Sequence, residues 1–567
     1  MTPSAKHCKG IIMLRSIGPV AFLALLMVGC GGGESSSTQP PPPARYTIGG
    51  TVSGLLGSGL VLQNSGGDAL PISASGTFTF PTAVPSGTSY AVAVKTSPSS
   101  PAQGCLIANG AGTVTSANIT NVSVSCQGSF TVSGTVSGLA GSGLALQTCM
   151  LVSGRLGASW SCNNNSPVSA DGAFSFNAVF PSSYHGFVFI AQQPTSPAQH
   201  CVINSAGVPA PTGTGFTVAC TGYAYVTNSA DNTLSAYSVD PTTGALKSLG
   251  SPLATGGSPF ATVAVEFNHN TPASDDFRYV YVVNQGSNDL SGFAVDSSTG
   301  ALSAVAGSPI AVGTDPQAIA VGVGSDLGSD LYVANTGSDN LMLFGVDQGT
   351  GALIGPSTYA TGKSPTSLAI AHVFTDVVYV ANHGGSNDIT AFGTYLESTP
   401  PNALVPVPGS PFPAGGNPLS LAIGAGGKFL YSANPDATTP TISGFSIDPS
   451  TGALSPLSGS PFALPVSHYM ATDQTGAFLY VTSDTGIVGY AINQNTGALT
   501  PLTGFPVAAG SNAFSIAIDS TNQFLYVTNE GGATVSGFRL DADSGALTPI
   551  PGAPFTSGSH PGFIAAF

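Results

Sequence analysis

The feature that most constrains the fold of this chain is a four-residue motif that recurs seven times between residues 223 and 567. The motif begins at intervals of 46 to 56 residues, as YVTN (225), YVVN (281), YVAN (332), YVAN (379), YSAN (431), YVTS (480) and YVTN (526). Such a period is typical of repeat architectures, in which each unit packs against its neighbours. The chain therefore has to fold as an array of similar units.

Each unit contains four segments that read as strands. An apolar run after a proline comes first, as in PFATVAVEF (259–267), and the recurring motif follows it. A polar loop leads to an alternating segment such as TLSAYSVD (233–240), and then to a turn and a last short strand. The turn DPTTG (240–244) supplies Asp at its start, Pro to fix φ and Gly for the left-handed position, which indicates a hairpin. Four strands in a repeat of about 45 residues predict a β-propeller blade.

The two ends of the repeated region complement each other. The region opens with a second strand and lacks a first one, whereas SHPGFIAAF (559–567) is a first strand with nothing after it. We expect this C-terminal strand to complete the first blade, because an unpaired sheet edge invites aggregation. The sequence thus predicts an all-β fold in which residues 223–567 form a seven-bladed β-propeller.

A shorter repeat precedes the propeller. TVSGLLGSGLVLQ (51–63) returns as TVSGLAGSGLALQ (135–147), GTFTF (76–80) as GAFSF (172–176), and SPAQGC (100–105) as SPAQHC (196–201). The offset is larger for the later pairs, so the second copy carries an insertion. Two small tandem domains follow, at 46–128 and 129–222. Their strand pattern resembles immunoglobulin-like or transthyretin-like β-sandwich modules of bacterial surface proteins, which implies a spacer role.

The cysteines of these two domains fit the duplication. Six cysteines allow 15 pairings. Two of them occupy matching places in each copy, and the remaining two bracket the insertion in the second copy. We therefore expect Cys105 to pair with Cys126, Cys149 with Cys162, and Cys201 with Cys220. The alternative is free buried thiols, which an oxidising compartment disfavours.

The N-terminus carries an export signal. Lys6, Lys9 and Arg15 precede the apolar run IGPVAFLALLMVG, which is too short to span a membrane as a helix. Residues 1–29 are therefore interpreted as a signal peptide. Translation starts at Met1 or at Met13, since the stretch from the second methionine has a more ordinary signal length.

The end of this signal resembles the lipobox of bacterial lipoproteins. LLMVGC ends at Cys30, and a run rich in Gly, Ser and Pro follows. The resemblance implies cleavage before Cys30, lipidation of its thiol, and a flexible tether over residues 30–45. Gly31 after the cysteine favours the outer membrane, facing either the periplasm or the cell surface. The alternative is simple secretion without an anchor.

Composition and motif content exclude several classes of function. Eleven Lys and Arg residues against 26 Asp and Glu residues give a net charge of −15, so the chain lacks the positive field that nucleic acids require. The sequence contains no G-x-S-x-G elbow, no H-E-x-x-H, no C-x-x-C and no P-loop. We therefore expect no nucleic-acid partner, no cofactor, and contact with a membrane only through the lipid. A monomer is expected.

The repeated region resembles the lactonase-like seven-bladed propellers known for their YVTN repeats, over all of 223–567. That family includes enzymes that open sugar lactones and exported proteins with no known reaction. In its enzymes an Arg commonly follows the Asn of the motif. Here those positions hold Ser229, Gln285, Thr336, His383, Pro435 and Glu530.

Cations are also scarce in the region that carries the resemblance. They are Lys247, Arg278, Lys363, Lys428 and Arg539, and we expect none of them over the channel mouth. Phosphate and carboxylate groups need cationic clamps. A phosphorylated sugar lactone is therefore not the expected substrate.

Propeller topology gathers one set of loops into the candidate site. Loops between second and third strands share a face with loops that lead into first strands, and this face is here called the channel mouth. It should carry His383, His468, His560, Glu530 and Asp315. Histidine and carboxylate can act as base and acid on an ester, and three histidines can hold a divalent metal. The plain alternative is that these are solvated loop residues.

Two functions remain open after these exclusions. The first is a binding or scaffold module that recognises a small molecule, a glycan or a protein at the channel mouth. The second is a lactonase-like hydrolase that uses the histidines and carboxylates of the same face. They differ in whether these side chains converge within hydrogen-bond reach.

The anchor is testable on the mature protein. Mass spectrometry should find a diacyl- or triacylglycerol-modified Cys30 at the N-terminus, because lipoprotein processing cuts directly before the modified cysteine. An unmodified N-terminus at any other residue would remove the anchor.

Overall fold

A computed structural model describes residues 44–100, 103–154, 157–179, 186–204, 214–267, 277–322, 329–373, 376–394, 403–435, 439–464, 467–483 and 486–567. The signal segment and Cys30 lie outside them. Over the described residues the regular elements are β-strands, apart from one 3₁₀ turn, η1 (Glu530–Gly532). None of the described elements is a helix with the length and hydropathy needed to cross a membrane.

Seven antiparallel sheets follow one another between residues 222 and 567 of the described chain. Their innermost strands are β49 (Pro561–Ala566), β21 (Pro259–Phe267), β26 (Pro316–Gly322), β30 (Pro365–His372), β35 (Ser420–Gly424), β40 (Ser467–Thr472) and β44 (Ala513–Ile518), in the order of blades one to seven. The second strands, which carry the motif, are β17 (Gly222–Asn228), β22 (Phe277–Asn284), β27 (Ser329–Asn335), β31 (Asp376–Asn382), β36 (Phe429–Asn434), β41 (Phe478–Ser483) and β45 (Phe524–Asn529).

The outer half of each blade is a hairpin, as the turn sequences predict. The third strands are β18 (Thr233–Val239), β23 (Asp289–Val295), β28 (Asn340–Val346), β32 (Asp388–Thr394), β37 (Thr441–Ile447), β42 (Gly486–Ile492) and β46 (Thr534–Leu540). The fourth strands are β19 (Leu246–Ser248), β24 (Leu302–Ala304), β29 (Leu353–Ala360), β33 (Leu404–Pro406), β38 (Leu454–Pro456), β43 (Leu499–Pro501) and β47 (Leu547–Pro549). Short additional strands pair with five of the third strands: β20 (Leu253–Ala254), β25 (Ile310–Ala311), β34 (Phe412–Pro413), β39 (Phe462–Ala463) and β48 (Phe555–Thr556).

The ring closes as the sequence predicts. β49 pairs with β17 in blade one, with Val226 opposite Ile564 and Tyr225 opposite Ala565. Each innermost strand contacts the innermost strands of both neighbouring blades, and β49 lies between β44 and β21. The seven-bladed propeller and its closure by the C-terminal strand are therefore confirmed.

A buried hydrogen bond joins successive blades and explains the tyrosine of the motif. In six blades the tyrosine hydroxyl donates to the carbonyl of the glycine in the hairpin turn of the next blade. The bonds are Tyr225 to Gly300 (3.1 Å), Tyr281 to Gly351 (2.8 Å), Tyr379 to Gly452 (2.7 Å), Tyr431 to Gly497 (2.8 Å), Tyr480 to Gly545 (2.8 Å) and Tyr526 to Gly244 (2.7 Å). These tyrosines are fully buried, and burial raises the pKa of each hydroxyl, which therefore stays a donor.

The glycine in the turn is required for two reasons. Gly351 adopts φ +70°, and a Cβ atom there would lie 2.3 Å from the ring of Tyr279 in the preceding blade. An L-residue is strained in this conformation, and the ring behind it leaves no space. The tyrosine of one blade and the glycine of the next therefore depend on each other.

The asparagine of the motif fixes the loops above the strands. Asn228 donates through Nδ2 to Thr233 Oγ1 (3.0 Å) and to Ser235 Oγ (2.9 Å), at the start of the third strand. Its Oδ1 accepts a hydrogen bond from the backbone of Gly558, 3.0 Å away, in the loop that leads into β49. One buried amide thus ties together the two kinds of loop that form the channel mouth.

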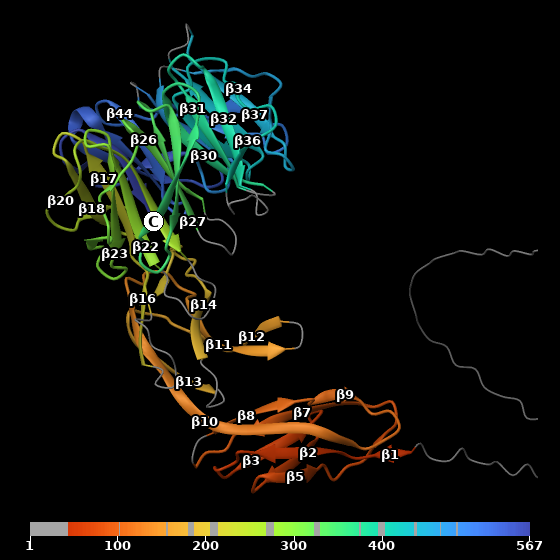
Figure 1. The fold of residues 1–567 in the computed structure, drawn as a ribbon. Coiled ribbons are helices and arrows are strands. Elements are labelled where there is room, and N and C mark those ends of the chain that lie inside the picture. The colour runs from red at the N-terminus through yellow and green to blue at the C-terminus, as the bar shows by residue number, and fades with distance from the viewer. Residues whose placement is uncertain are drawn as a thin grey trace, which may run out of the picture.

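The N-terminal strands form two smaller bodies that share one strand. The first contains β1 (Arg45–Tyr46), β2 (Ile48–Ser53), β3 (Leu60–Asn64), β4 (Asp68–Ile72), β5 (Gly76–Thr79), β6 (Val84–Pro85), β7 (Ser89–Thr96), β8 (Gln103–Ala108) and β9 (Ala111–Thr113). The second contains β11 (Ala145–Gly154), β12 (Gly157–Pro167), β13 (Gly172–Val179), β14 (Gly186–Gln192), β15 (Val202–Asn204) and β16 (Thr214–Ala219). β10 (Ile119–Ser137) runs through both, so the predicted boundary at 128/129 falls inside this strand (Figure 1).

Each smaller body, here called module one and module two, has its own hydrophobic core between sheets. Disulfides join Cys105 to Cys126, Cys149 to Cys162, and Cys201 to Cys220. These are the pairs that the duplication predicts. The likeness to immunoglobulin-like or transthyretin-like sandwiches stays a prediction.

Two glycines of one turn test the contact between blades. Gly351→Ala should lower the free energy of unfolding by about 1–3 kcal/mol, because it combines a left-handed backbone with a clash against Tyr279. Gly349→Ala should stay within about 0.5 kcal/mol, since its Cβ would meet nothing closer than Asp347 Oδ1 at 3.7 Å. Denaturant unfolding measures both. Equal effects of the two variants would contradict the packing explanation.

Ring closure is tested by truncation. Deletion of residues 559–567 removes β49, including the buried Ile564, and leaves the edge of β17 unpaired. The truncated protein should unfold at a lower temperature and over a broader range in differential scanning calorimetry. A thermogram that matches the full-length protein would show that β49 does not close the ring.

Candidate functional site at the channel mouth

A repeated backbone contact builds the channel mouth. In five blades the backbone amide of the residue after the motif asparagine donates to the backbone carbonyl of the residue directly before the innermost strand. The bonds run from Ser229 to His560 (3.1 Å), Gln285 to Ser258 (3.0 Å), Thr336 to Asp315 (2.9 Å), His383 to Ser364 (3.0 Å) and Glu530 to Asn512 (3.0 Å). The accepting residues all have positive φ, between 49° and 55°. The backbone therefore fixes two positions per blade whatever side chain they carry.

Four of the predicted site residues occupy these positions. His383 and Glu530 stand at donor positions, and Asp315 and His560 stand at acceptor positions. Asn, Asp and His are the non-glycine residues that tolerate left-handed backbone best, which suits Asp315 and His560. His468 lies in β40, but its side chain is outside the described residues.

Glu530 and His560 come together across the junction of blades seven and one. His560 Nδ1 lies 3.6 Å from Glu530 Oε1, and Asn512 Nδ2 donates to Glu530 Oε2 at 2.6 Å. The imidazole is 62% exposed and the carboxylate 33% exposed. At 3.6 Å the contact is too long for a hydrogen bond, and exposed contacts of this kind stabilise a fold very little. What the contact contributes is therefore a possible base and a possible acid placed side by side.

Asp315 occupies the equivalent place at the junction of blades two and three but has different partners. Gln285 Nε2 donates to Asp315 Oδ1 at 2.5 Å, and Gln317 Nε2 reaches Oδ2 at 3.5 Å. Among the described residues, no hydrogen bond or ion pair joins Asp315 to His560 or Glu530. Glu530 and His560 are thus the candidates that the described contacts bring together.

A cation also lies on this face, contrary to expectation. Lys363 directly precedes Ser364, whose carbonyl accepts the His383 backbone bond, so it belongs to a channel-mouth loop. Its ammonium pairs with Asp339 Oδ2 at 2.5 Å, and the carboxyl pKa is lowered by that hydrogen bond. The sequence could not reveal this partner, because Asp339 belongs to the loop of the preceding blade.

A metal site is not formed by the residues that the structure describes. Within that part of the chain, no three His, Cys, Asp or Glu side chains lie close enough to hold an ion. The three-histidine arrangement that the loops suggest would need His468, whose side chain is not described.

An aromatic cluster beside the Glu530–His560 pair went unnoticed in the sequence. Phe260, Tyr469, Phe514 and Phe563 come from the innermost strands of blades two, six, seven and one. Their rings lie 4.7 to 6.0 Å apart, and Tyr469 contacts Phe563 past the intervening blade. The rings thus bridge the channel.

The cluster lies at the same end of the channel as the polar pair. Phe563 follows His560 by three residues, and Phe514 follows Asn512 by two. Tyr469 is buried, which raises the pKa of its hydroxyl, and the charge of Glu530 raises it further. The three phenylalanines are partly exposed. An aromatic residue near the start of four innermost strands was the signal that could have revealed the cluster.

Comparison with known proteins agrees with this architecture. The family model described as "Lactonase, 7-bladed beta-propeller" matches residues 200–370 and 431–562. The unmatched stretch includes the end of blade four, whose turn lacks the T-G-A-L pattern of its neighbours. No curated protein matches the chain.

Solved structures are similar to the chain at low sequence identity. A "putative 6-phosphogluconolactonase" from Bacteroides uniformis is 16% identical, with a TM-score of 0.50, and the match covers 61% of this chain and 99% of that one. A second such protein, from Bacteroides fragilis, is 18% identical, with a TM-score of 0.48 and coverage of 61% and 98%. A periplasmic gluconolactonase from Pseudomonas aeruginosa is 17% identical, with a TM-score of 0.47 and coverage of 61% and 98%.

The TM-score of 0.50 with the Bacteroides uniformis protein shows a shared fold, and an identity of 16% carries no activity across. The family model is more specific, because its matched residues make up more than half of the chain and include the motif strands of six blades. The protein therefore belongs to the lactonase seven-bladed β-propeller family.

Proposed function

We propose that the propeller binds a small, uncharged, ring-shaped ligand, such as a sugar or a lactone, at the channel mouth. The observation that carries this proposal is the aromatic cluster that bridges the channel beside Glu530 and His560. Aromatic faces bind the apolar faces of rings, while neighbouring polar groups orient the ligand. Phe563 and His560 lie on the same closing segment and present both kinds of contact.

The charge distribution supports an uncharged ligand. Carboxylate and phosphate groups are normally held by Arg or Lys. Lys363 is the cation that the described channel-mouth loops supply, and Asp339 already neutralises it. The side chains of Arg278 and Arg539 lie on the opposite face of the propeller, where they donate to the carbonyls of Thr221 and Thr242 respectively.

Lactone hydrolysis is the second candidate, and the Glu530–His560 pair favours it specifically. With its Nδ1 proton directed at Glu530, neutral His560 keeps Nε2 as a base. Nε2 would take a proton from water as the oxygen attacks the lactone carbonyl. The ring C–O bond then breaks, and the alkoxide recovers the proton from the imidazolium, which yields a hydroxy acid. Catalytic contacts often tighten only when substrate binds, so the 3.6 Å separation is compatible with this role.

The cellular location of the protein is proposed from its N-terminal sequence. We propose that lipid on Cys30 anchors a monomeric protein in the outer membrane. The signal-like pattern of residues 1–29 supports an envelope protein, and the lipobox-like LLMVGC sequence supports the anchor. Whether the propeller faces the periplasm or the cell surface is settled by protease accessibility in intact cells.

Binding is tested with uncharged pyranoses and lactones and with their phosphorylated counterparts in titration calorimetry. The wild-type protein should prefer the uncharged compounds. Phe563→Leu and Phe514→Leu keep apolar volume but lose the aromatic face, and should weaken binding about threefold to tenfold. If none of the uncharged compounds binds the wild-type protein, the proposed function is wrong.

Hydrolysis is tested on the same lactones by proton release. If the second function holds, His560→Ala should lower the rate about 100-fold or more, since a lost general base costs that much. His372→Ala is the matched control, because His372 forms a comparable contact with Asp376 (2.6 Å) in blade four, at the β30–β31 hairpin. Equal rates for both variants would exclude His560 as the base.

A further inference from the structure

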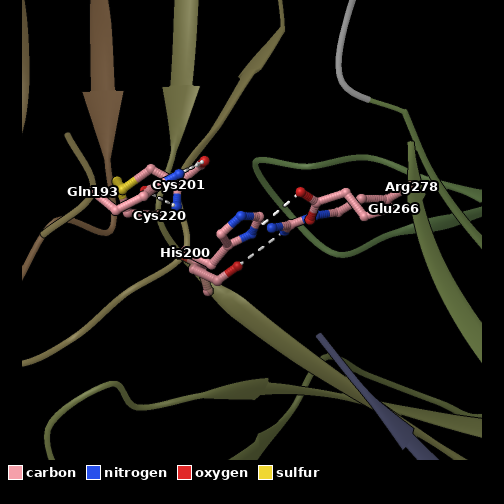
Figure 2. A network of polar contacts seen from close by, with 7 residues as sticks. Gln193, His200, Cys201, Cys220, Glu266 and Arg278 are labelled. Atoms are coloured by element: carbon pink, nitrogen blue, oxygen red, sulfur yellow. Dashed lines mark hydrogen bonds and ion pairs between the residues drawn. A yellow bond between two sulfur atoms is a disulfide. The ribbon is translucent and has the colours of Figure 1, made fainter. Parts of the chain in front are cut away.

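Module two contacts the propeller on the face opposite to the channel mouth. Two contact residues on the propeller are Glu266 and Arg278, which face each other next to the Phe267–Phe277 pair, at the end where the β21–β22 hairpin turns. His200 of module two reaches Glu266, with Nδ1 3.2 Å from Oε1, while Arg278 Nε lies 2.8 Å from Oε2 (Figure 2). One carboxylate therefore joins a histidine of the module to an arginine of the propeller.

Arg278 is the most deeply buried part of this contact. Its side chain is 1% exposed, and the guanidinium donates to the carbonyl of Thr221 at 3.3 Å. It also lies over the ring of Phe567, 5.0 Å from the centroid. A buried charge is tolerated only when its partners are in place. Burial would raise the pKa of Glu266, but the bond from His200 and the charge of Arg278 lower it overall.

The covalent junction between the two bodies is short. β16 ends at Ala219 and β17 begins at Gly222, so only Cys220 and Thr221 lie between module and propeller. The Cys201–Cys220 disulfide ties this junction to the segment that carries His200. A further bond runs from Gln523 Nε2, in the turn between β44 and β45, to the carbonyl of Ala198 at 2.8 Å.

The duplicated sequence shows which residue is special to this contact. SPAQGC in module one and SPAQHC in module two differ only at Gly104 and His200. The preceding glutamines do the same work in both modules: Gln103 Oε1 accepts from Leu56 and Gly57, and Gln199 Oε1 accepts from Ala140 and Gly141. The glutamine thus has the same structural role in both copies. The one residue that differs between the copies is His200, which contacts the propeller.

We propose that the face of the propeller formed by Glu266, Arg278 and Gln523 is a docking surface specific for module two, and that His200 is the residue that gives the specificity. Module one carries glycine at the equivalent place and offers no side chain to Glu266. The docked module holds the propeller with its channel mouth turned away from the module. Module two is therefore held in a fixed position against the propeller. The spacer role predicted from the sequence rests on module one and the tether.

Hydrogen exchange on the full-length protein tests the docking. In His200→Ala, amides on both sides of the contact, at residues 198–201, 264–267 and 277–280, should exchange about tenfold faster or more. Glu266→Gln should act in the same direction. His200→Gln keeps a side-chain donor toward Glu266 and should restore most of the protection. His372→Ala, which breaks a histidine–carboxylate contact within blade four, is the control and should leave these segments unchanged.

The outcomes separate docking from general stability. Faster exchange confined to the contact segments, with the intact Cys201–Cys220 disulfide, supports the proposal. Unchanged exchange in His200→Ala and Glu266→Gln overturns it, as does an increase spread evenly over the propeller. The result is independent of the channel mouth, so failure of ligand binding leaves this test unaffected.

Discussion

The fold depends on one buried hydrogen bond, from the tyrosine of the recurring motif to a glycine carbonyl in the next blade. The bond needs a left-handed turn to direct the carbonyl inward, and the turn needs glycine because an aromatic or aliphatic side chain of the preceding blade fills the space behind it. Two motifs far apart in each repeat, Y-V-x-N and T-G-A-L, are therefore the two halves of one contact. In the described chain this contact joins six of the seven pairs of neighbouring blades.

Regular blades leave the channel mouth free to vary. The motif asparagine and the repeated backbone bond hold the two kinds of loop, so the side chains at these positions are not needed for the fold. Glutamine and aspartate occupy one junction, and glutamate and histidine occupy the equivalent junction across blades seven and one. The same scaffold can therefore carry different chemistry at each junction, which is why membership in the family does not settle an activity.

Much of the architecture could be predicted from the sequence, because the copies of a repeat can be compared with one another. The number of blades, the closing role of the last strand and the three disulfides follow from comparing the chain with itself. The contacts within the site could not be predicted in this way, because they join residues of different blades. Spacing places Glu530 and His560 on one face, but not within 3.6 Å of each other, and places Asp315 there without revealing its amide partners. The pairing of Lys363 with Asp339 also crosses between blades, and the contact of His200 with Glu266 crosses from module two to the propeller, so neither could be predicted from spacing.

The placement of His560 and Phe563 beside the strand that closes the ring has a consequence for timing. β49 follows every other strand of the propeller in the sequence, so six blades and most of the first can be made before these two residues emerge. The acid–base pair and the aromatic cluster both remain incomplete until then. Assembly of the ring and assembly of this end of the channel are thus a single event, and an unfinished chain holds neither the pair nor the complete cluster.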